Sequence, residues 1–309
     1  MTLRKPPKDP NAATRIIGRL VGLVLLLVIF ALVIWVASTN QQAAALESSP
    51  AVPGPAGRLV EAGDVVINVR EYGAGDDTVV LIHDDQMVGG ALLVPLAEEL
   101  VSRGRRVLVP DLVGYGLSAR PVTPGRIYST AGQTDTLASL LDEEGVGNAL
   151  VVGFGWGGGV AAELAVAYPD LVSSLALVDT PDLPVPSRGW DTLEALPFGV
   201  GDAVAFTREG ASSGAEARFR KECSADSRCD DATLEFFREA VSLPGTSSSI
   251  RARRASERAS VAPDRLDEIT AATLITSSNR AAADALASRF PDATAAGVGA
   301  EEISADDLP

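Results

Sequence analysis

The stretch VVGFGWGGG, Val151–Gly159, has the spacing of a catalytic turn between a strand and a helix. A sharp turn of this kind, with a glycine two residues to either side of its centre, presents the central side chain for attack on a carbonyl carbon. A serine in that place needs a histidine to take its proton and an acid to orient the histidine. Here the central residue is Gly155. The stretch therefore predicts the backbone of a nucleophilic site without its nucleophile.

Few other side chains could supply such chemistry. His83 is the only histidine, and it is followed by Asp84 and Asp85. The two cysteines, Cys223 and Cys229, lie close together in the sequence, and in an exported domain such a pair forms a disulfide. Two free thiols and half of a metal site are the alternatives, but one histidine and two cysteines leave a metal ion short of ligands. We expect no metal and no cofactor.

Segments typical of strands and helices alternate over most of the chain. Short apolar runs suited to buried strands occupy 78–83, 105–111, 148–152, 172–179 and 271–278, with a last short strand near 293–299. Segments with helical spacing lie between them. Such alternation predicts an α/β protein with a mostly parallel, doubly wound sheet. Between about 182 and 262 the alternation gives way to short amphipathic pieces.

With this order of elements, residues 58–309 resemble the α/β-hydrolase superfamily of lipases, esterases and epoxide hydrolases. VVLIHDD resembles the family's strand and oxyanion loop, DLVGYGLS resembles D-L-P-G-F-G-x-S, and GFGWGG resembles the nucleophile turn. The resemblance implies that the insertion at about 182–262 is a helical cap and that a pocket lies between cap and sheet.

The residues that align with the family's catalytic triad are of the wrong types. The nucleophile position is Gly155, the base position is Ala300 and the acid position is Asn279. Asp179, after the preceding strand, could replace the acid geometrically, but no histidine is left for it to orient. The resemblance therefore implies a degenerate hydrolase, with no catalytic residue to assign.

The loop that aligns with the oxyanion loop carries Asp84 where the family has glycine, with Asp85 next. If these carboxylates point inward, they oppose an oxyanion by about 4 kcal/mol at about 4 Å and an effective dielectric near 20. If they point outward, they are surface charges. We expect His83 to be a packing residue or a pocket wall, and Trp156 to be either pocket floor or core. The predicted pocket thus comprises these four residues and Gly155.

The N-terminal part predicts a membrane anchor. Residues 20–37 are eighteen residues without a charge, which as a helix reach roughly 27 Å, close to the hydrocarbon thickness of a bilayer. The basic segment 1–19 before them predicts a cytoplasmic N-terminus and an extracytoplasmic remainder. An Ala/Ser/Pro/Gly-rich linker, 38–57, follows. The alternative is a signal peptide that is cleaved after Ala45.

The charge balance limits the partners. The chain has 26 basic and 41 acidic residues and a net charge of −15, so we expect no nucleic-acid partner. The only basic cluster beyond the N-terminus comprises Arg251, Arg253, Arg254 and Arg258. It is interpreted as a solvated cap face, with an anion site or an acidic-partner site as the alternative.

Three functions are compatible with these features. The first is a single-pass, membrane-anchored pseudo-hydrolase that binds a small apolar ligand or a protein of the cell envelope. The second is an active hydrolase that uses Asp84, Asp85 or His83 in a non-standard acid–base role. The third is a structural envelope subunit with a filled pocket.

Overall fold

The computed structural model describes residues 12–47, 57–121, 125–180, 196, 199–223, 229–256 and 263–309. Within them, eight strands form one sheet in the order β1-β2-β4-β3-β5-β6-β7-β8. The strands are β1 (Arg58–Ala62), β2 (Val65–Tyr72), β3 (Thr78–Ile82), β4 (Arg106–Pro110), β5 (Ala149–Phe154), β6 (Val172–Val178), β7 (Ala272–Thr276) and β8 (Ala293–Ala296). β2 pairs antiparallel with β1 and with β4, and the other pairs are parallel. The prediction of a mostly parallel sheet is confirmed.

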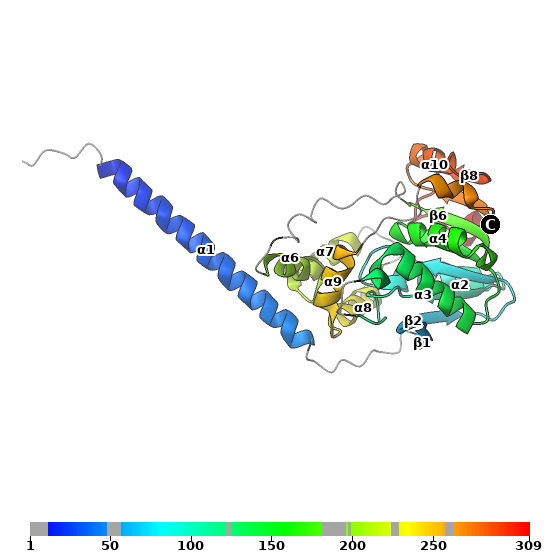
Figure 1. Ribbon diagram of the computed structural model, residues 1–309, viewed down its shortest axis with the longest axis horizontal. Coiled ribbons are helices and arrows are strands. Elements are labelled where there is room, and N and C mark those ends of the chain that lie inside the picture. The colour runs from blue at the N-terminus through cyan, green and yellow to red at the C-terminus, as the bar shows by residue number, and fades with distance from the viewer. Residues whose placement is uncertain are drawn as a thin grey trace, which may run out of the picture.

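Helices cover the sheet and form a separate group beside it (Figure 1). The α-helices are α1 (Ala12–Glu47), α2 (Val94–Ser102), α3 (Thr130–Glu143), α4 (Trp156–Ala167), α6 (Val200–Glu209), α7 (Ser213–Cys223), α8 (Asp231–Val241), α9 (Thr246–Ala255) and α10 (Arg280–Ala287). Short 3₁₀ helices are η1 (Gly89–Leu93), η2 (Arg126–Tyr128), η3 (Pro169–Leu171), η4 (Pro263–Glu268) and η5 (Ala305–Asp307).

Buried side chains alternate between the two faces of the sheet, because successive residues of a strand point to opposite sides. In β3, Val80 and Ile82 join the core beneath α3, α4 and α10. Val79 and Leu81 join the opposite core, beneath α2 and η5. Burial on both faces explains why these strands are continuous apolar runs rather than alternating ones.

The helices α6–α9 follow β6 and precede β7, within the predicted cap interval, and Figure 1 shows them grouped at one side of the sheet. They have their own core, which includes Phe219, Phe237 and Ile250. Met87 and Val88, from the loop after β3, belong to the same core. The cap is thus packed onto the loop that follows β3. The first part of the predicted interval, 182–195, lies outside the described residues.

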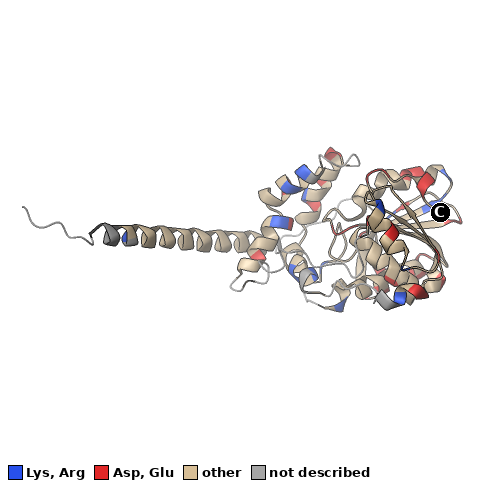
Figure 2. Ribbon diagram, turned by 90° about the horizontal axis from the view of Figure 1, so that it is seen from above, with Lys and Arg blue, Asp and Glu red and all other residues tan. Residues whose placement is uncertain are grey.

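The N-terminal helix α1 contains the membrane segment predicted at 20–37. Residues Arg19–Gln42 are long and apolar enough to cross a membrane, by length and composition. In Figure 2 the ribbon of this helix is tan, the colour of uncharged residues, over most of its length, whereas the rest of the chain carries blue and red positions. The helix continues to Glu47, so the predicted linker at 38–57 begins too early. The physical reason is that the Gln and Ala residues at 41–45 have high helix propensity, so the helix continues beyond the apolar segment.

The C-terminal end of α1 contacts the cap. Asn40 Nδ2 donates to the carbonyl oxygen of Gly199, 3.5 Å away, at the start of α6. Thr39 is buried at the same contact region of the helix. The apolar side chains nearer the N-terminus, among them Leu26 and Phe30, remain exposed. The cap therefore lies next to the end of the apolar segment.

Asp111, immediately after β4, connects the elements on one side of the sheet. Its side chain is fully buried. Oδ1 accepts from Arg70 Nη1 at 2.9 Å and from Gly90 N at 2.8 Å. Oδ2 accepts from Asn68 Nδ2 at 2.9 Å and from Leu117 N at 3.0 Å. One carboxylate thus holds β2, the loop after β3 and the loop after β4 together.

The surroundings of Asp111 keep it ionised. Burial raises the pKa of a carboxyl group, but here the charge of Arg70 and the backbone donors outweigh it and lower the pKa below its usual value. Gly116 lies against the carboxylate with φ +47°, and a Cβ there would lie 2.0 Å from Oδ2. This contact explains the second glycine of DLVGYGLS, Gly116, since a residue with a Cβ would overlap the carboxylate.

We predict that Asp111→Ala lowers the free energy of unfolding by about 3–5 kcal/mol, because it leaves Arg70 buried without its counter-charge. Urea unfolding of the full chain in detergent, followed by circular dichroism, measures the change. Asp142→Ala, at an exposed position of α3, is the control and should stay within about 0.5 kcal/mol. Equal effects of the two substitutions would contradict the role of Asp111.

Candidate functional site

A cavity of about 600 Å³ lies at the carboxyl ends of the parallel strands, beneath the cap. Ligands of open α/β sheets bind at this edge, and the volume is in the range of small-molecule sites. Its lining comes from the loops after β3, β5, β6, β7 and β8, from η1 and from the cap: His83, Asp84, Gln86, Gly89, Leu92, Leu93, Phe154, Gly155, Asp179, Phe219, Cys223, Cys229, Ser278, Gly299, Ala300, Glu301 and Glu302.

Three of the five predicted pocket residues, His83, Asp84 and Gly155, line this cavity. The other two do not. The side chain of Trp156 is buried in the core between α4 and Tyr115, with the two rings 5.9 Å apart, so the core interpretation holds for it. Asp85 lines a second, smaller cavity of about 150 Å³ on the cap side.

Gly155 forms the turn between β5 and α4 with φ +53° and ψ −120°. A residue with a Cβ is strained in this region, whereas glycine enters it at little cost. The turn is held by Gly155 N, which donates to Val178 O at 2.9 Å, and by Gly155 O, which accepts from Gly158 N at 3.1 Å. The strained backbone of a nucleophile turn is therefore present.

Asp84 lies directly over this turn. Its Oδ1 accepts a hydrogen bond from Trp156 N at 2.7 Å. A Cβ on residue 155 would lie 2.3 Å from Asp84 Cγ and 2.4 Å from Oδ1. Of the two orientations left open by the sequence, Asp84 adopts the inward one. Its carboxylate occupies the space that a side chain at residue 155 would need, and it accepts the hydrogen bond of the neighbouring backbone N–H.

His83 is buried, and both of its ring nitrogens are engaged. Nε2 accepts from Leu112 N at 2.9 Å, so the proton is on Nδ1, which donates to the carbonyl oxygen of Asp84. The ring packs edge-on against Tyr115, with the centroids 5.1 Å apart. Burial is the largest cause that lowers its pKa, and the charge of Asp111 only partly opposes it. His83 is a neutral wall residue whose acceptor is already used.

Asp179, at the end of β6, joins the loops that follow β7 and β8. Oδ1 accepts from Ser277 Oγ at 2.8 Å and from Ser278 N at 3.1 Å, and Oδ2 accepts from Ala300 N at 2.5 Å. With φ +45°, it is the only residue other than glycine with a positive φ among those described. Strain of this kind persists where surrounding contacts fix the backbone. The sequence suggested Asp179 as a substitute for the acid, but no local pattern predicted that it would hold these two loops together.

Asn279, the residue at the predicted acid position, does not line the cavity. Its side chain is the N-cap of α10 and accepts from Ala282 N at 3.3 Å. A short polar side chain at this point accepts from a helix N–H that has no acceptor within the helix, so it turns toward the helix and not toward the pocket. Ala300, at the predicted base position, does line the cavity, through a methyl group and not an imidazole.

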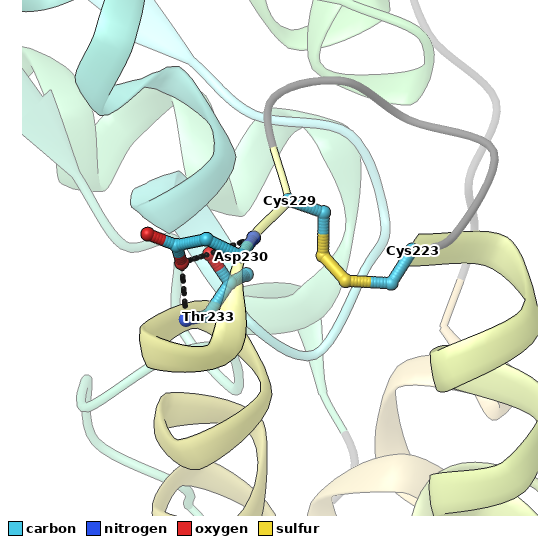
Figure 3. Close-up of a disulfide and its surroundings, with 4 residues drawn as sticks. All are labelled: Cys223, Cys229, Asp230 and Thr233. Atoms are coloured by element: carbon cyan, nitrogen blue, oxygen red, sulfur yellow. Dashed lines mark hydrogen bonds between the residues drawn. A yellow bond between two sulfur atoms is a disulfide. The ribbon is translucent and has the colours of Figure 1, made fainter.

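The predicted disulfide between Cys223 and Cys229 is present (Figure 3). Both cysteines line the cavity. The disulfide links the end of α7 to the start of α8. Next to it, the Asp230 carboxylate caps α8 by accepting from Thr233 N and Thr233 Oγ1, both at 2.8 Å. Among the described residues, no group of three or more His, Cys, Asp or Glu could hold a metal ion.

The predicted basic cluster does not form one solvated face. Arg251 is exposed and pairs with Asp202 at 3.1 Å. Arg253 is buried, with its guanidinium 4.1 Å from the centre of the Tyr115 ring and 3.4 Å from Glu209. The interpretation as a solvated face is therefore wrong for Arg253, which fastens α9 to the loop after β4. The side chain of Arg254, and Arg258, lie outside the described residues.

We predict that Gly155→Ala destabilises the protein by about 1–3 kcal/mol, from backbone strain and from the clash with Asp84. Asp84→Gly should recover part of that loss, with a coupling of at least about 0.5 kcal/mol in a double-mutant cycle measured by urea unfolding. Gly145→Ala is the matched control, because Gly145 has φ +64° but no atom lies within 4 Å of the place that a Cβ would take there. Additive effects of the substitutions at 84 and 155 would refute the contact.

Comparisons with known proteins agree with the fold. A family described as alpha/beta hydrolase fold matches residues 78–229. The 2-hydroxy-6-oxo-2,4-heptadienoate hydrolase of Pseudomonas putida is 35% identical over 124 residues, which are 40% of this chain and 44% of that protein. The chain thus spans less than half of this curated relative.

Solved structures match over a longer part. The DBJA delta mutant has a TM-score of 0.61 at 20% identity, covering 79% of this chain and 90% of that one. An esterase from Exiguobacterium antarcticum has a TM-score of 0.59 at 19% identity, covering 78% and 90%. The chain therefore has the α/β-hydrolase fold.

Proposed function

We propose that the protein is a membrane-anchored, extracytoplasmic binding protein that uses an α/β-hydrolase fold without hydrolase activity. The observation that carries the proposal is the carboxylate of Asp84, which lies over Gly155 and accepts the Trp156 N–H at 2.7 Å. In a hydrolase, the N–H after the nucleophile stabilises developing negative charge. Here a fixed negative charge takes that donor, so an oxyanion would meet repulsion instead of stabilisation.

The proton-transfer groups support the same proposal. The position that aligns with the family's base is Ala300, and its backbone N–H is bonded to Asp179. The chain's one histidine, His83, accepts from a backbone N–H with the nitrogen that a general base would need. Without an acceptor for its proton, a hydroxyl nucleophile is weak. Binding, in contrast, needs only the cavity of about 600 Å³.

A second candidate is an active hydrolase that depends on Asp84, with Asp85 or His83 as helpers. Two observations favour it. The relative from Pseudomonas putida is named a hydrolase, and a carboxylate over the turn can itself act as a nucleophile. The loss of turnover on substitution of Asp84 would distinguish this candidate from the first. A structural envelope subunit with a filled pocket is the third, and the open cavity weighs against it.

Membrane anchoring is supported by the apolar helix at Arg19–Gln42 and by the basic residues before it. The disulfide supports an oxidising compartment for the domain. We propose a retained anchor, with a cytoplasmic N-terminus, as opposed to cleavage after Ala45. Contact between Asn40 and Gly199 adds support, since cleavage after Ala45 would remove it.

We predict that the full chain in detergent does not hydrolyse p-nitrophenyl esters above the rate without protein. Gly155→Ser should not be labelled by a fluorophosphonate, because the introduced hydroxyl lacks a base and clashes with Asp84. Turnover by the unaltered chain that disappears in Asp84→Asn/Asp85→Asn would establish the second candidate instead. Labelling of the Gly155→Ser variant would show that a working base is present.

We also predict the orientation of the chain. The chain carries one epitope tag at each terminus, and the cells are treated so that protease reaches the outer face of the intact cytoplasmic membrane. Protease should then remove the C-terminal tag and leave the N-terminal tag protected. The mature chain should keep its N-terminal tag, which separates a retained anchor from a cleaved signal peptide. Protection of the C-terminal tag would reverse the proposed topology.

A further inference from the structure

We propose that the cavity beneath the cap takes an organic cation, namely an ammonium group on an apolar body. This inference rests on the proposed binding function and names the ligand class. It narrows the expectation of a purely apolar ligand, and it depends on how charge is distributed over the cavity wall.

The cavity lining combines apolar side chains with carboxylates. Leu92 and Leu93 of η1, Phe154 of β5 and Phe219 of α7 form the apolar part, next to the disulfide. The loops after β6 and β8 contribute Asp179, Glu301 and Glu302, and the loop after β3 contributes Asp84. A ligand that fills this volume can therefore contact both hydrocarbon and carboxylates.

The carboxylates of the loops after β6 and β8 lack a built-in counter-charge. Asp179 is held by neutral donors, namely the N–H groups of Ser278 and Ala300 and the hydroxyl of Ser277. Glu301 and Glu302 are exposed, and neither forms an ion pair with a lysine or arginine of the described part of the chain. These three negative charges are thus left for a ligand to complement.

The basic residues of the cap are placed elsewhere. Arg208 and Arg218 line the neighbouring cavity of about 150 Å³, with Asp85. Arg253 is buried against Tyr115 and Glu209. Among the described lining residues of the larger cavity there is no lysine or arginine. A carboxylate or phosphate ligand would therefore meet only negative charge, and electrostatic complementarity selects a cation.

A metal ion is not the cation proposed. The described residues contain no group of three His, Cys, Asp or Glu with metal-binding geometry. The lining combines separate carboxylates with apolar side chains. Such a lining suits an ammonium group on an apolar body better than a small, hard metal ion, which needs several oxygen ligands close together.

The test compares three probes that share one body: 2-phenylethylammonium, 2-phenylethanol and 3-phenylpropionate. Isothermal titration calorimetry on the full chain in detergent, up to about 10 mM probe, gives their affinities. We expect the ammonium to bind at least about 10-fold more tightly than the carboxylate, with the alcohol between, and the preference to shrink at high salt. Equal affinities, tighter binding of the carboxylate, or no binding of any probe would each overturn the proposal.

A variant pair locates the effect. Glu301→Gln/Glu302→Gln should lower the preference for the ammonium at least about 3-fold, because two charges at the cavity are removed. Both positions are exposed, so folding should be retained. Glu98→Gln/Glu143→Gln removes two exposed charges away from the cavity and should leave the preference unchanged. Equal effects of the two double variants would overturn the assignment to this cavity.

The outcome is separable from that of the proposed function. Ester turnover would disprove a non-catalytic role and leave the preference for a cation standing. Loss of the preference, in a chain without turnover, would disprove only the ligand class.

Discussion

The buried carboxylate of Asp111 is the interaction on which the site depends. Its oxygens accept from Asn68 and Arg70 of β2, from Gly90 in the loop after β3 and from Leu117 in the loop after β4. A buried charge is tolerated only when it is paired and hydrogen-bonded, and this one is both. Its contacts fix the loop that carries His83 and Asp84, because that loop cannot move without leaving a donor unsatisfied.

The turn at Gly155 and the aspartate over it depend on each other. A side chain at 155 would overlap the carboxylate of Asp84, and without Asp84 the Trp156 N–H would lose the acceptor at 2.7 Å. The backbone geometry of a nucleophile turn is thus combined with an internal hydrogen bond from Trp156 N–H to Asp84.

The cap closes the cavity from the other side and is fastened at two places. Arg253 of α9 lies over the ring of Tyr115 in the loop after β4, and this buried cation–π contact joins the cap to that loop. Asn40 of α1 bonds to Gly199 at the start of α6. The disulfide between α7 and α8 stiffens the wall itself. The position of the cavity is therefore linked both to the sheet and to the end of the apolar N-terminal helix.

The sequence by itself indicated the parallel strands, the turn at Gly155, the apolar N-terminal segment and the Cys223–Cys229 pair, because each is recorded in local residue type and spacing. Tertiary structure alone decided where side chains point. Asp84 turns inward because Trp156 N–H is within reach, and Arg253 is buried because it packs against Tyr115 and Glu209. Asn279 caps a helix instead of entering the cavity. These outcomes depend on residues far away in the chain, which no local pattern records.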